Sequence, residues 1–194
     1  MSDRLSLIQK HVSDQSALER HILEAVKRQR AEDMVRADPD VNTLLIEIER
    51  TLESHLDALG KLAESYDAKT ESVFKKAFTA AAGVVAGLYD QVRSEEISRD
   101  LRDDYTALSL AAMGYTAFTA FGLTIKEPRI ADLAERHLKD LTPLLVSISE
   151  KLPVYVVKET VKENPEATVD ATVGPEAVRR TQSAWAREVT ESLA

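Results

Sequence analysis

The pattern Glu-x-His followed by Ile or Leu occurs three times in the sequence, and it offers residue types that bind metals. The three segments are 19–22, 53–56 and 135–138. Their histidines fall on the apolar sides of expected amphipathic helices, and these are His21, His55 and His137. Imidazole and carboxylate are common ligands of zinc, iron and manganese.

A metal site built on this pattern needs carboxylates close to the histidines. The resulting candidate ligands are His21, Glu24, His55, Asp57, His137 and Asp140. A histidine on an apolar stripe is more often a core residue that bonds to a Ser, Thr, Tyr or backbone group. The sequence therefore favours core histidines and no cofactor, and the alternative is a single Fe, Mn or Zn ion held by two or three of the histidines.

The composition of the chain excludes several classes of protein. The chain has 194 residues with a net charge of −8, whereas a nucleic-acid partner would require clustered Lys and Arg. It has no cysteine, which excludes disulfides, thiolate nucleophiles and cysteine-bound metals. The first residues, MSDRLSLIQK, lack the apolar segment of a signal peptide. We expect a cytoplasmic protein without a nucleic-acid partner.

The most informative stretch for the fold is 106–125, TALSLAAMGYTAFTAFGLTI, which contains no Asp, Glu, Lys, Arg or His. A helix that is apolar on every side has to be surrounded on every side. We therefore expect a central helix over 97–122, with Gly122 as its C-cap. Twenty uncharged residues could also cross a membrane. The many Thr, Ala and Gly residues, and flanks with charges of both signs, favour a core helix and no membrane span.

Apolar residues spaced three and four apart predict further helices around this one. The expected helices are 3–33, 39–66, 70–93, one from Pro128 to Pro153, and an amphipathic C-terminal helix from Pro175 that carries Trp185. The first helix could break near Ser13 and restart at a capping box from Ser16 to Glu19. Asp38 should be the N-cap of the second helix, with Pro39 at its first position. Pro143 should kink the helix that contains it.

These patterns predict an all-α protein with two parts. Residues 1–152 should form an antiparallel bundle of about five helices, and residues 153–194 an extension with one docking helix. Residues 154–164 could continue the preceding helix or form a short edge segment. In 77–89, Gly83 and Gly87 leave one side almost without side chains, which suits close contact with another backbone.

This layout, with its mid-helix histidines, resembles the ferritin-like superfamily, especially its small bacterial stress-induced branch. The resemblance covers residues 3–152. It implies a ferritin-like bundle in which a di-iron or di-manganese centre takes one Glu from each of two helices and a Glu-x-x-His from each of two others. Here Leu52 and Ala134 stand three residues before His55 and His137, so neither Glu-x-x-His is complete. Residues 106–125 of the central helix offer no carboxylate where a mid-bundle site would need one, so two metal ions would lack compensating charge.

Two functions follow from the resemblance and its gaps. The first is a non-enzymatic bundle, stress-associated by resemblance, that has lost the di-metal centre and acts through self-association or partner binding. A homo-oligomer is expected, with a dimer as the default symmetry. The second is a metal-binding protein that uses the mid-helix histidines for storage or redox work.

Overall fold

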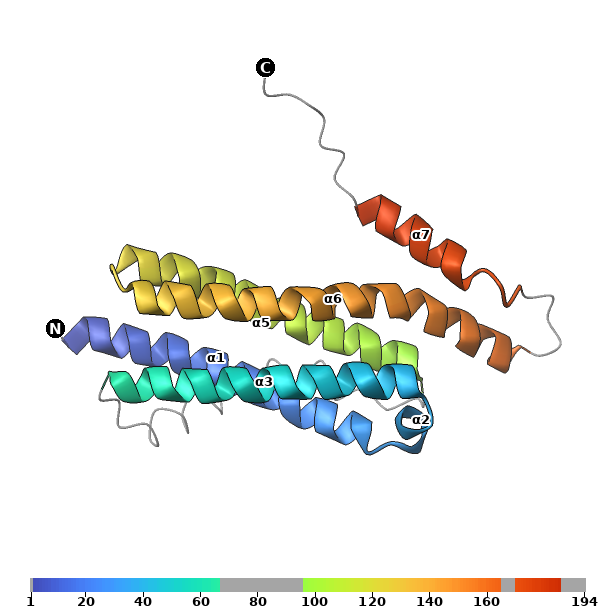
Figure 1. Cartoon of the computed structure of the whole chain (residues 1–194), viewed down its shortest axis with the longest axis horizontal. Helices are drawn as coiled ribbons and strands as arrows, with labels where there is room; N and C mark the ends of the chain where they lie inside the picture. The colour runs from blue at the N-terminus through green and yellow to red at the C-terminus, as the bar shows by residue number, and fades with distance from the viewer. Residues whose placement is uncertain (1, 67–95, 165–169, 186–194) are drawn as a thin grey trace, which may run out of the picture.

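The computed structural model describes residues 2–66, 96–164 and 170–185 (Figure 1). None of these residues lies in a strand, so the expected all-α class is confirmed. The predicted helix over 70–93, with Gly83 and Gly87, lies outside the described residues. The described helices are α1 (Ser2–Arg30), α2 (Asp33–Arg36), α3 (Pro39–Ser65), α5 (Ile97–Thr124), α6 (Pro128–Glu163) and α7 (Gly174–Trp185).

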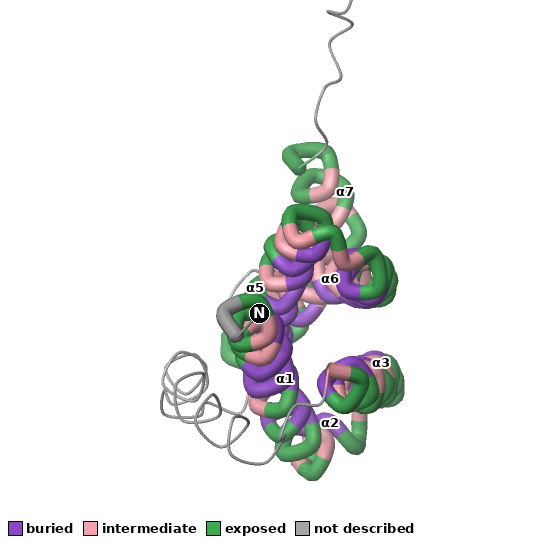
Figure 2. The backbone as a smooth tube through the Cα atoms, turned by 90° about the vertical axis from the view of Figure 1, so that its left-hand side faces the viewer, coloured by how far each residue is buried: buried purple, intermediate pink, exposed green. Residues whose placement is uncertain are grey.

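The long helices α1, α3, α5 and α6 lie side by side as two antiparallel pairs (Figures 1 and 2). At one end of the bundle, Arg4 of α1 donates to the Ile125 carbonyl and to Glu127 in the turn between α5 and α6. The Tyr66 hydroxyl, at the end of α3, bonds to the same Glu127 side chain at 3.0 Å. The first turn of α1, the end of α3 and the α5–α6 turn therefore meet at this end.

Contacts at the opposite end fix the direction of each helix. The backbone N–H of Ser98, at the start of α5, donates to Glu159 near the end of α6. Lys158 of α6 lies 3.8 Å from Asp38, at the start of α3. Helices α3 and α5 consequently run parallel to each other, and residues 67–95 connect opposite ends of the bundle.

The predicted hairpin of the first two long helices is confirmed. The Asp38 carboxylate accepts hydrogen bonds from the N–H groups of Asp40 and Val41, and Pro39 opens α3. This capping satisfies N–H groups that have no partner inside the helix. Farther along the pair, Lys27 bonds to Glu53 of the facing helix. The short helix α2 in the connection was not predicted.

The expected break in the first helix is wrong, because α1 is continuous from Ser2 to Arg30. Ser13 and Ser16 are buried on its bundle side. Glu19 is also buried there, and it bonds to a histidine of α3 instead of completing a capping box. These polar residues face the interior of the bundle, and they do not mark a helix end.

The central helix differs from expectation at its end and on one side. α5 continues to Thr124, so Gly122 lies inside the helix and is not its C-cap. The described residues do not surround α5, since Met113 and Leu123 are each 63% exposed. Within the described part of the chain, α5 alone is long and apolar enough to cross a membrane, a property that core helices of soluble proteins share.

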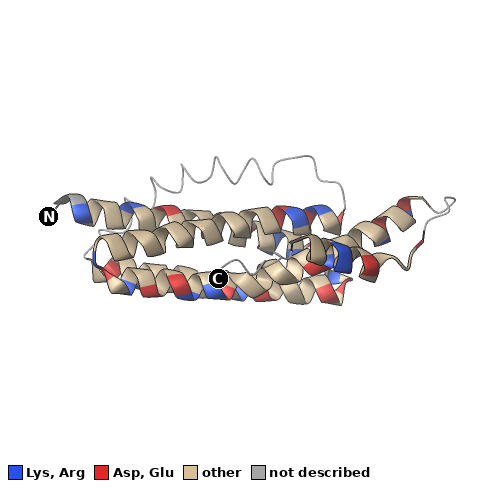
Figure 3. Ribbon diagram, turned by 90° about the horizontal axis from the view of Figure 1, so that it is seen from above, with Lys and Arg blue, Asp and Glu red and all other residues tan. Residues whose placement is uncertain are grey.

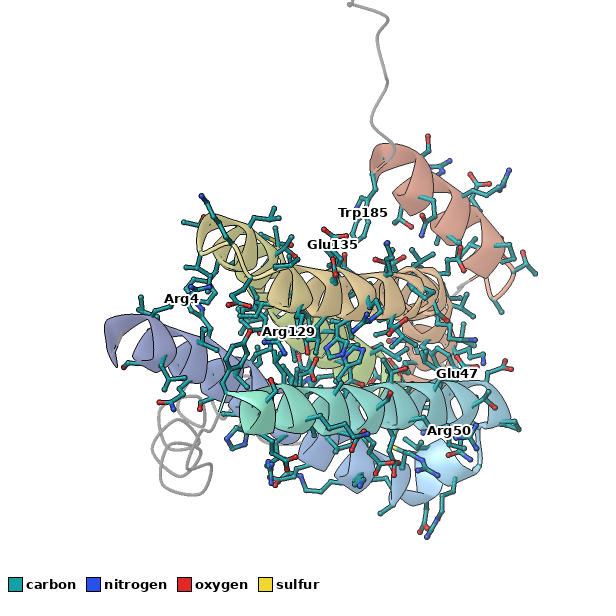
Figure 4. All side chains as sticks on the ribbon, turned by 60° about the vertical axis from the view of Figure 1, so that its left-hand side comes forward. Arg4, Glu47, Arg50, Arg129, Glu135 and Trp185 are labelled. Carbon is teal, nitrogen blue, oxygen red and sulfur yellow. The ribbon has the colours of Figure 1, made fainter. Side chains whose placement is uncertain are left out.

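Helix α6 does not end at Pro153 as expected. It continues through Pro143 and Pro153 to Glu163, so 154–163 form the helical alternative. Residue 152, the expected boundary between bundle and extension, therefore lies inside a helix. The predicted C-terminal helix is present as α7, which packs along the end of α6. Trp185 extends from α7 toward the α5–α6 pair (Figure 4), and its ring centroid lies 5.7 Å from that of Tyr105.

The core consists of aliphatic side chains on the inward sides of the long helices, which Figure 2 shows as buried. Small residues let α5 and α6 approach closely near their connecting turn. A Cβ added at Gly122 would lie 2.7 Å from the backbone nitrogen of Ala131. Such a contact is too short for any real Cβ, and backbone cannot move aside cheaply.

We expect Gly122→Ala to lower the free energy of unfolding by about 1–3 kcal/mol, because the methyl group would push α5 away from α6. Gly60→Ala is the matched control, since nothing lies within 4 Å of a Cβ at that position in α3. There the better helix propensity of alanine should raise stability by up to about 1 kcal/mol. Urea unfolding of both variants measures the difference, and equal effects would contradict this packing.

Candidate functional site

Polar side chains from all four long helices meet in the middle of the bundle. We call this set the mid-bundle polar layer, and it consists of Gln15 and Glu19 of α1, His55 of α3, Tyr115 of α5, and His137 and Asp140 of α6. All except Asp140 are buried. A buried polar group is stable only when it is hydrogen-bonded, so the bonds within the layer determine what it can do.

His55 connects two carboxyl groups. Its Nδ1 lies 3.0 Å from Oε1 of Glu19, and its Nε2 lies 3.4 Å from Oδ2 of Asp140. The exposed fractions of the two carboxyl side chains differ widely, at 0% for Glu19 and 59% for Asp140. The imidazole therefore joins a carboxyl group in the interior to one that reaches solvent.

His137 lies directly against His55. The two rings are stacked with centroids 3.8 Å apart and planes within 5° of parallel. Nδ1 of His137 lies 2.8 Å from the hydroxyl of Tyr115, whose ring meets His137 edge-on. Two protonated imidazoles at this distance would repel each other strongly in a medium of low dielectric constant.

A close approach between α1 and α5 completes the layer. Gln15 donates from Nε2 to the Ala111 carbonyl at 3.1 Å. Its Oε1 lies only 2.2 Å from where a Cβ on Gly114 would be, so only glycine leaves room for this amide. Gln15 and Tyr115 lie beside the Glu19 carboxyl group. The second oxygen of that group, Oε2, nevertheless makes no hydrogen bond of normal geometry.

Burial shifts the proton affinities of the layer in opposite directions for acids and bases. It raises the pKa of Glu19, against the opposing effect of the hydrogen bond to His55. Burial, with the nearby His55 and Arg136, lowers the pKa of His137 to about 3. Burial and the Glu19 charge raise the pKa of Tyr115, so its hydroxyl keeps its proton. His137 is therefore neutral in the folded protein at neutral pH.

The layer reaches solvent between α3 and α6. A groove of about 500 Å³ opens there, and it is lined by Glu47, Arg50, Thr51, Ser54, His55, Lys139, Asp140, Pro143 and Leu144. His55 is 1% exposed, so it lies beneath the groove and not within it. Asp140, whose side chain is 59% exposed, is the member of the layer that reaches this groove.

The structure brings together three of the six predicted ligands, His55, His137 and Asp140. The other three lie outside the layer. His21 is only partly buried, Glu24 is exposed, and the exposed Asp57 pairs with Lys61 of the next turn. The Glu-x-His pattern thus contributes different members in different helices: the histidine in α3 and α6, but the glutamate in α1.

The donor set does not fit a metal ion as it stands. Among the described residues, no group of three or more His, Asp or Glu side chains is arranged to hold one. Parallel stacked rings direct their nitrogen lone pairs side by side, whereas a shared ion needs lone pairs that converge on one point. Among the described residues, Glu19 is the single fully buried carboxyl group that bonds to either ring, and its partner is His55.

Sequence reasoning missed Gln15, Glu19, Tyr115 and Gly114 as parts of the site. A signal for Glu19 was present, because Val12, Glu19 and Val26 are spaced by seven residues and lie on one side of a helix. Tyr115 lies within the expected central helix, but its partner on α6 could not be identified from spacing. Gly114 acquires its role only through Gln15 of another helix.

We expect Tyr115→Phe to lower the free energy of unfolding by about 1–3 kcal/mol, since it leaves the buried Nδ1 of His137 without its partner. Tyr105→Phe is the control on the same helix, because no hydrogen bond of the Tyr105 hydroxyl is found among the described residues, and its effect should stay within about 0.5 kcal/mol. Chemical denaturation measures both. If the two substitutions cost the same, the Tyr115–His137 bond contributes nothing specific.

The lowered pKa of His137 also predicts a pH dependence of stability. The folded protein keeps His137 neutral down to about pH 3, whereas the unfolded chain protonates it near pH 6.5. The unfolded state thus binds more protons in this window, so stability should fall as the pH falls from 6.5 to 3, by at most about 1.4 kcal/mol per pH unit for this group.

His137→Asn should make the stability curve flatter over this pH range, because asparagine offers a hydrogen-bonding atom near the Nδ1 position but does not titrate. His21→Asn makes the same substitution outside the layer and serves as the control. Glu19 remains in both variants, so the opposite contribution of its raised pKa cancels in the comparison. Urea midpoints at pH 4 and pH 7 provide the measurement; identical slopes in both variants would refute this assignment.

The chain was compared with known protein families, curated proteins and solved structures. No family model, curated protein or solved structure matches the chain. The chemistry of the mid-bundle polar layer therefore has to be inferred from its own distances, burial and charges.

Proposed function

We propose that the chain is a ferritin-like helical bundle in which the mid-bundle polar layer stands where metal-binding members hold two ions. The directions of the helices support this proposal. Ferritin-like bundles join two antiparallel helix pairs by one long crossover connection. Here α3 and α5 run parallel, so the chain has to cross the length of the bundle between them.

The members of the layer support the proposal position by position. The di-metal pattern requires a glutamate from each of two helices and a Glu-x-x-His from each of two others. Glu19 of α1 corresponds to one lone glutamate, and His55 and His137 correspond to the two histidines. Leu52 and Ala134 occupy the glutamate positions three residues before those histidines. Tyr115 of α5 lies where the second lone glutamate would be expected.

The loss of carboxylates removes the reason for metals to bind. Of the four glutamates in the pattern, only one has a counterpart here, which is Glu19. A second metal ion would therefore add buried charge that nothing compensates. The remaining groups bond to each other instead, as Glu19 with His55 and Tyr115 with His137. This mutual bonding is the observation that carries the proposal, because it satisfies the histidines without an ion.

We infer a non-enzymatic role on this basis. The protein acts by self-association or by binding a partner, and a homodimer is the expected assembly. Its acidic composition, with a net charge of −8, suits a cytoplasmic protein that does not bind nucleic acid. An association with stress rests on the family resemblance alone.

A second candidate function is the binding of a single metal ion. It is favoured by one observation, that Glu19, His55, His137 and Asp140 share one layer although they come from three helices. Oε2 of Glu19 is buried without a hydrogen bond and could serve as a ligand. An ion there would require His55 and His137 to leave their stacked arrangement, so that their nitrogens converge.

The two candidates predict different metal contents. Untagged protein purified from cultures supplied with iron, manganese and zinc should contain far less than one metal ion per chain by mass spectrometry. Its thermal midpoint should not change when any of these metals is added, because an ion that binds only the folded state would raise it. Sedimentation should show a species of twice the 21.5 kDa chain mass if the assembly is a dimer.

Near-stoichiometric metal that is lost in a His55→Ala and His137→Ala double variant would replace the first proposal with the second. His21→Ala is the matched control, since His21 belongs to the same sequence pattern but lies outside the layer. Metal lost equally from the control would indicate binding elsewhere on the protein. A monomer at all concentrations, combined with no metal, would leave partner binding as the remaining form of the first proposal.

A further inference from the structure

One side of α5 is apolar and exposed within the described part of the chain. Its exposed residues follow a spacing of four and three, which places them in one stripe along the helix: Thr106, Leu110, Met113, Ala117, Ala120 and Leu123. We call this stripe the outer face of α5. Met113 and Leu123 are each 63% exposed and Leu110 is 39% exposed. Soluble proteins rarely leave a contiguous apolar surface of this length in water.

The outer face offers a partner little besides apolar contact. No charged residue occurs between positions 106 and 125 (Figure 3). The hydroxyls on and beside this face already bond within the helix, with Thr106, Thr116 and Thr124 each donating to the carbonyl four residues earlier. A partner that brought charges would leave them without counter-charges, so the face suits an uncharged segment.

The positions of the chain ends show which segment is available. Residues 67–95, which lie outside the described residues, start after Tyr66 beside the α5–α6 turn. They finish before Glu96 at the start of α5, where Ser98 bonds to Glu159. This segment must therefore run from the C-terminal to the N-terminal end of α5. The 28 residues of α5 correspond to about 42 Å at 1.5 Å per residue.

The connection resembles the outer face in two respects, the lack of charged residues and the position of its uncharged part along the length of α5. Its charged residues are confined to 67–76 and 90–95, whereas 77–89, AFTAAAGVVAGLY, contain none. The uncharged part occupies the middle of the connection, so an antiparallel path along α5 brings it level with the middle of that helix, near Leu110. Small side chains and two glycines allow another backbone to come close.

We propose that residues 77–89 of the same chain cover the outer face of α5, antiparallel to it. A tethered segment has a high effective concentration and loses no translational freedom when it binds. A second copy of the chain would have to displace it to reach the same face. The match of uncharged stretches also explains why α5 can be apolar on all sides in an acidic protein.

The absence of cysteine from the chain makes a direct test possible. Met113→Cys is combined in turn with Ala80→Cys, Ala82→Cys, Val84→Cys and Ala86→Cys, and each double variant is oxidised mildly. At least one pair should form a disulfide within a single chain, since a bridge requires the two Cα atoms to lie within about 7 Å. The product is a monomer whose mobility changes on reduction and whose yield is independent of concentration.

Val146→Cys provides the matched control in the same four combinations. Val146 is an exposed apolar residue on α6, 47% accessible, and it does not belong to the outer face. These combinations should give no bridge within a chain. A second measurement uses charge: Met113→Glu should lower the thermal midpoint by about 5 °C or more, because it places a carboxylate under a covered face, while Val146→Glu should leave it unchanged.

Three results would overturn the proposal. Disulfides formed mainly between chains, with yields that fall on dilution, would assign the outer face to a second copy. Partition of the cysteine-free protein into phosphatidylcholine vesicles would assign it to a membrane. Failure of all four pairs, together with an unchanged midpoint for Met113→Glu, would show that the face stays open to water.

Discussion

The need to pair buried polar groups with one another controls how the helices of this protein fit together. A carboxyl group, two imidazoles, an amide and a phenol lie in the interior, where each unpaired group would cost about 1–3 kcal/mol. The bonds of Glu19 to His55 and of Tyr115 to His137 each link the two helices of one antiparallel pair. A slip of one helical turn, about 5.4 Å, would break each bond. Aliphatic packing alone tolerates such slips more easily, so the polar layer specifies the register of the bundle.

The direction of the chain is a second constraint, and it acts on the surface of the bundle. Because α3 and α5 run parallel, no short turn can join them, and the connection between them has to span the whole length of α5. The apolar outer face of α5 is the surface available to such a connection. The parallel direction of α3 and α5 is therefore related to the apolar composition of α5, a helix that the described residues bury only in part.

Periodicity was sufficient to predict most of the helices, because each long helix carries one apolar stripe and clear end signals such as Asp38 and Pro39. It failed where a residue that commonly marks a helix end instead makes a contact with another helix. Ser13 and Ser16 were interpreted as a helix break, although their hydroxyls face the interior of a continuous α1. Gly122 was interpreted as a helix end, but its missing side chain serves the contact with Ala131.

The candidate site was predictable only in part for the same reason. The histidines could be placed on the inward sides of their helices, and His55 and His137 do meet. Which residue of α1 and α5 would face them depends on the rotation of those helices within the bundle. That rotation is determined by tertiary contacts such as Gln15 against Gly114, which a single sequence does not reveal.

The division of the polar layer between two helix pairs has a consequence for the order of folding. The α1–α3 pair brings together Glu19 and His55, and the α5–α6 pair brings together Tyr115 and His137, so each pair forms one bond of the layer on its own. Water can still reach these groups until the pairs associate. Docking of the two pairs is then the step that removes water from the Glu19 carboxyl group and stacks the two imidazoles. The free-energy barrier to folding should rise at this step whenever the two imidazoles are both protonated.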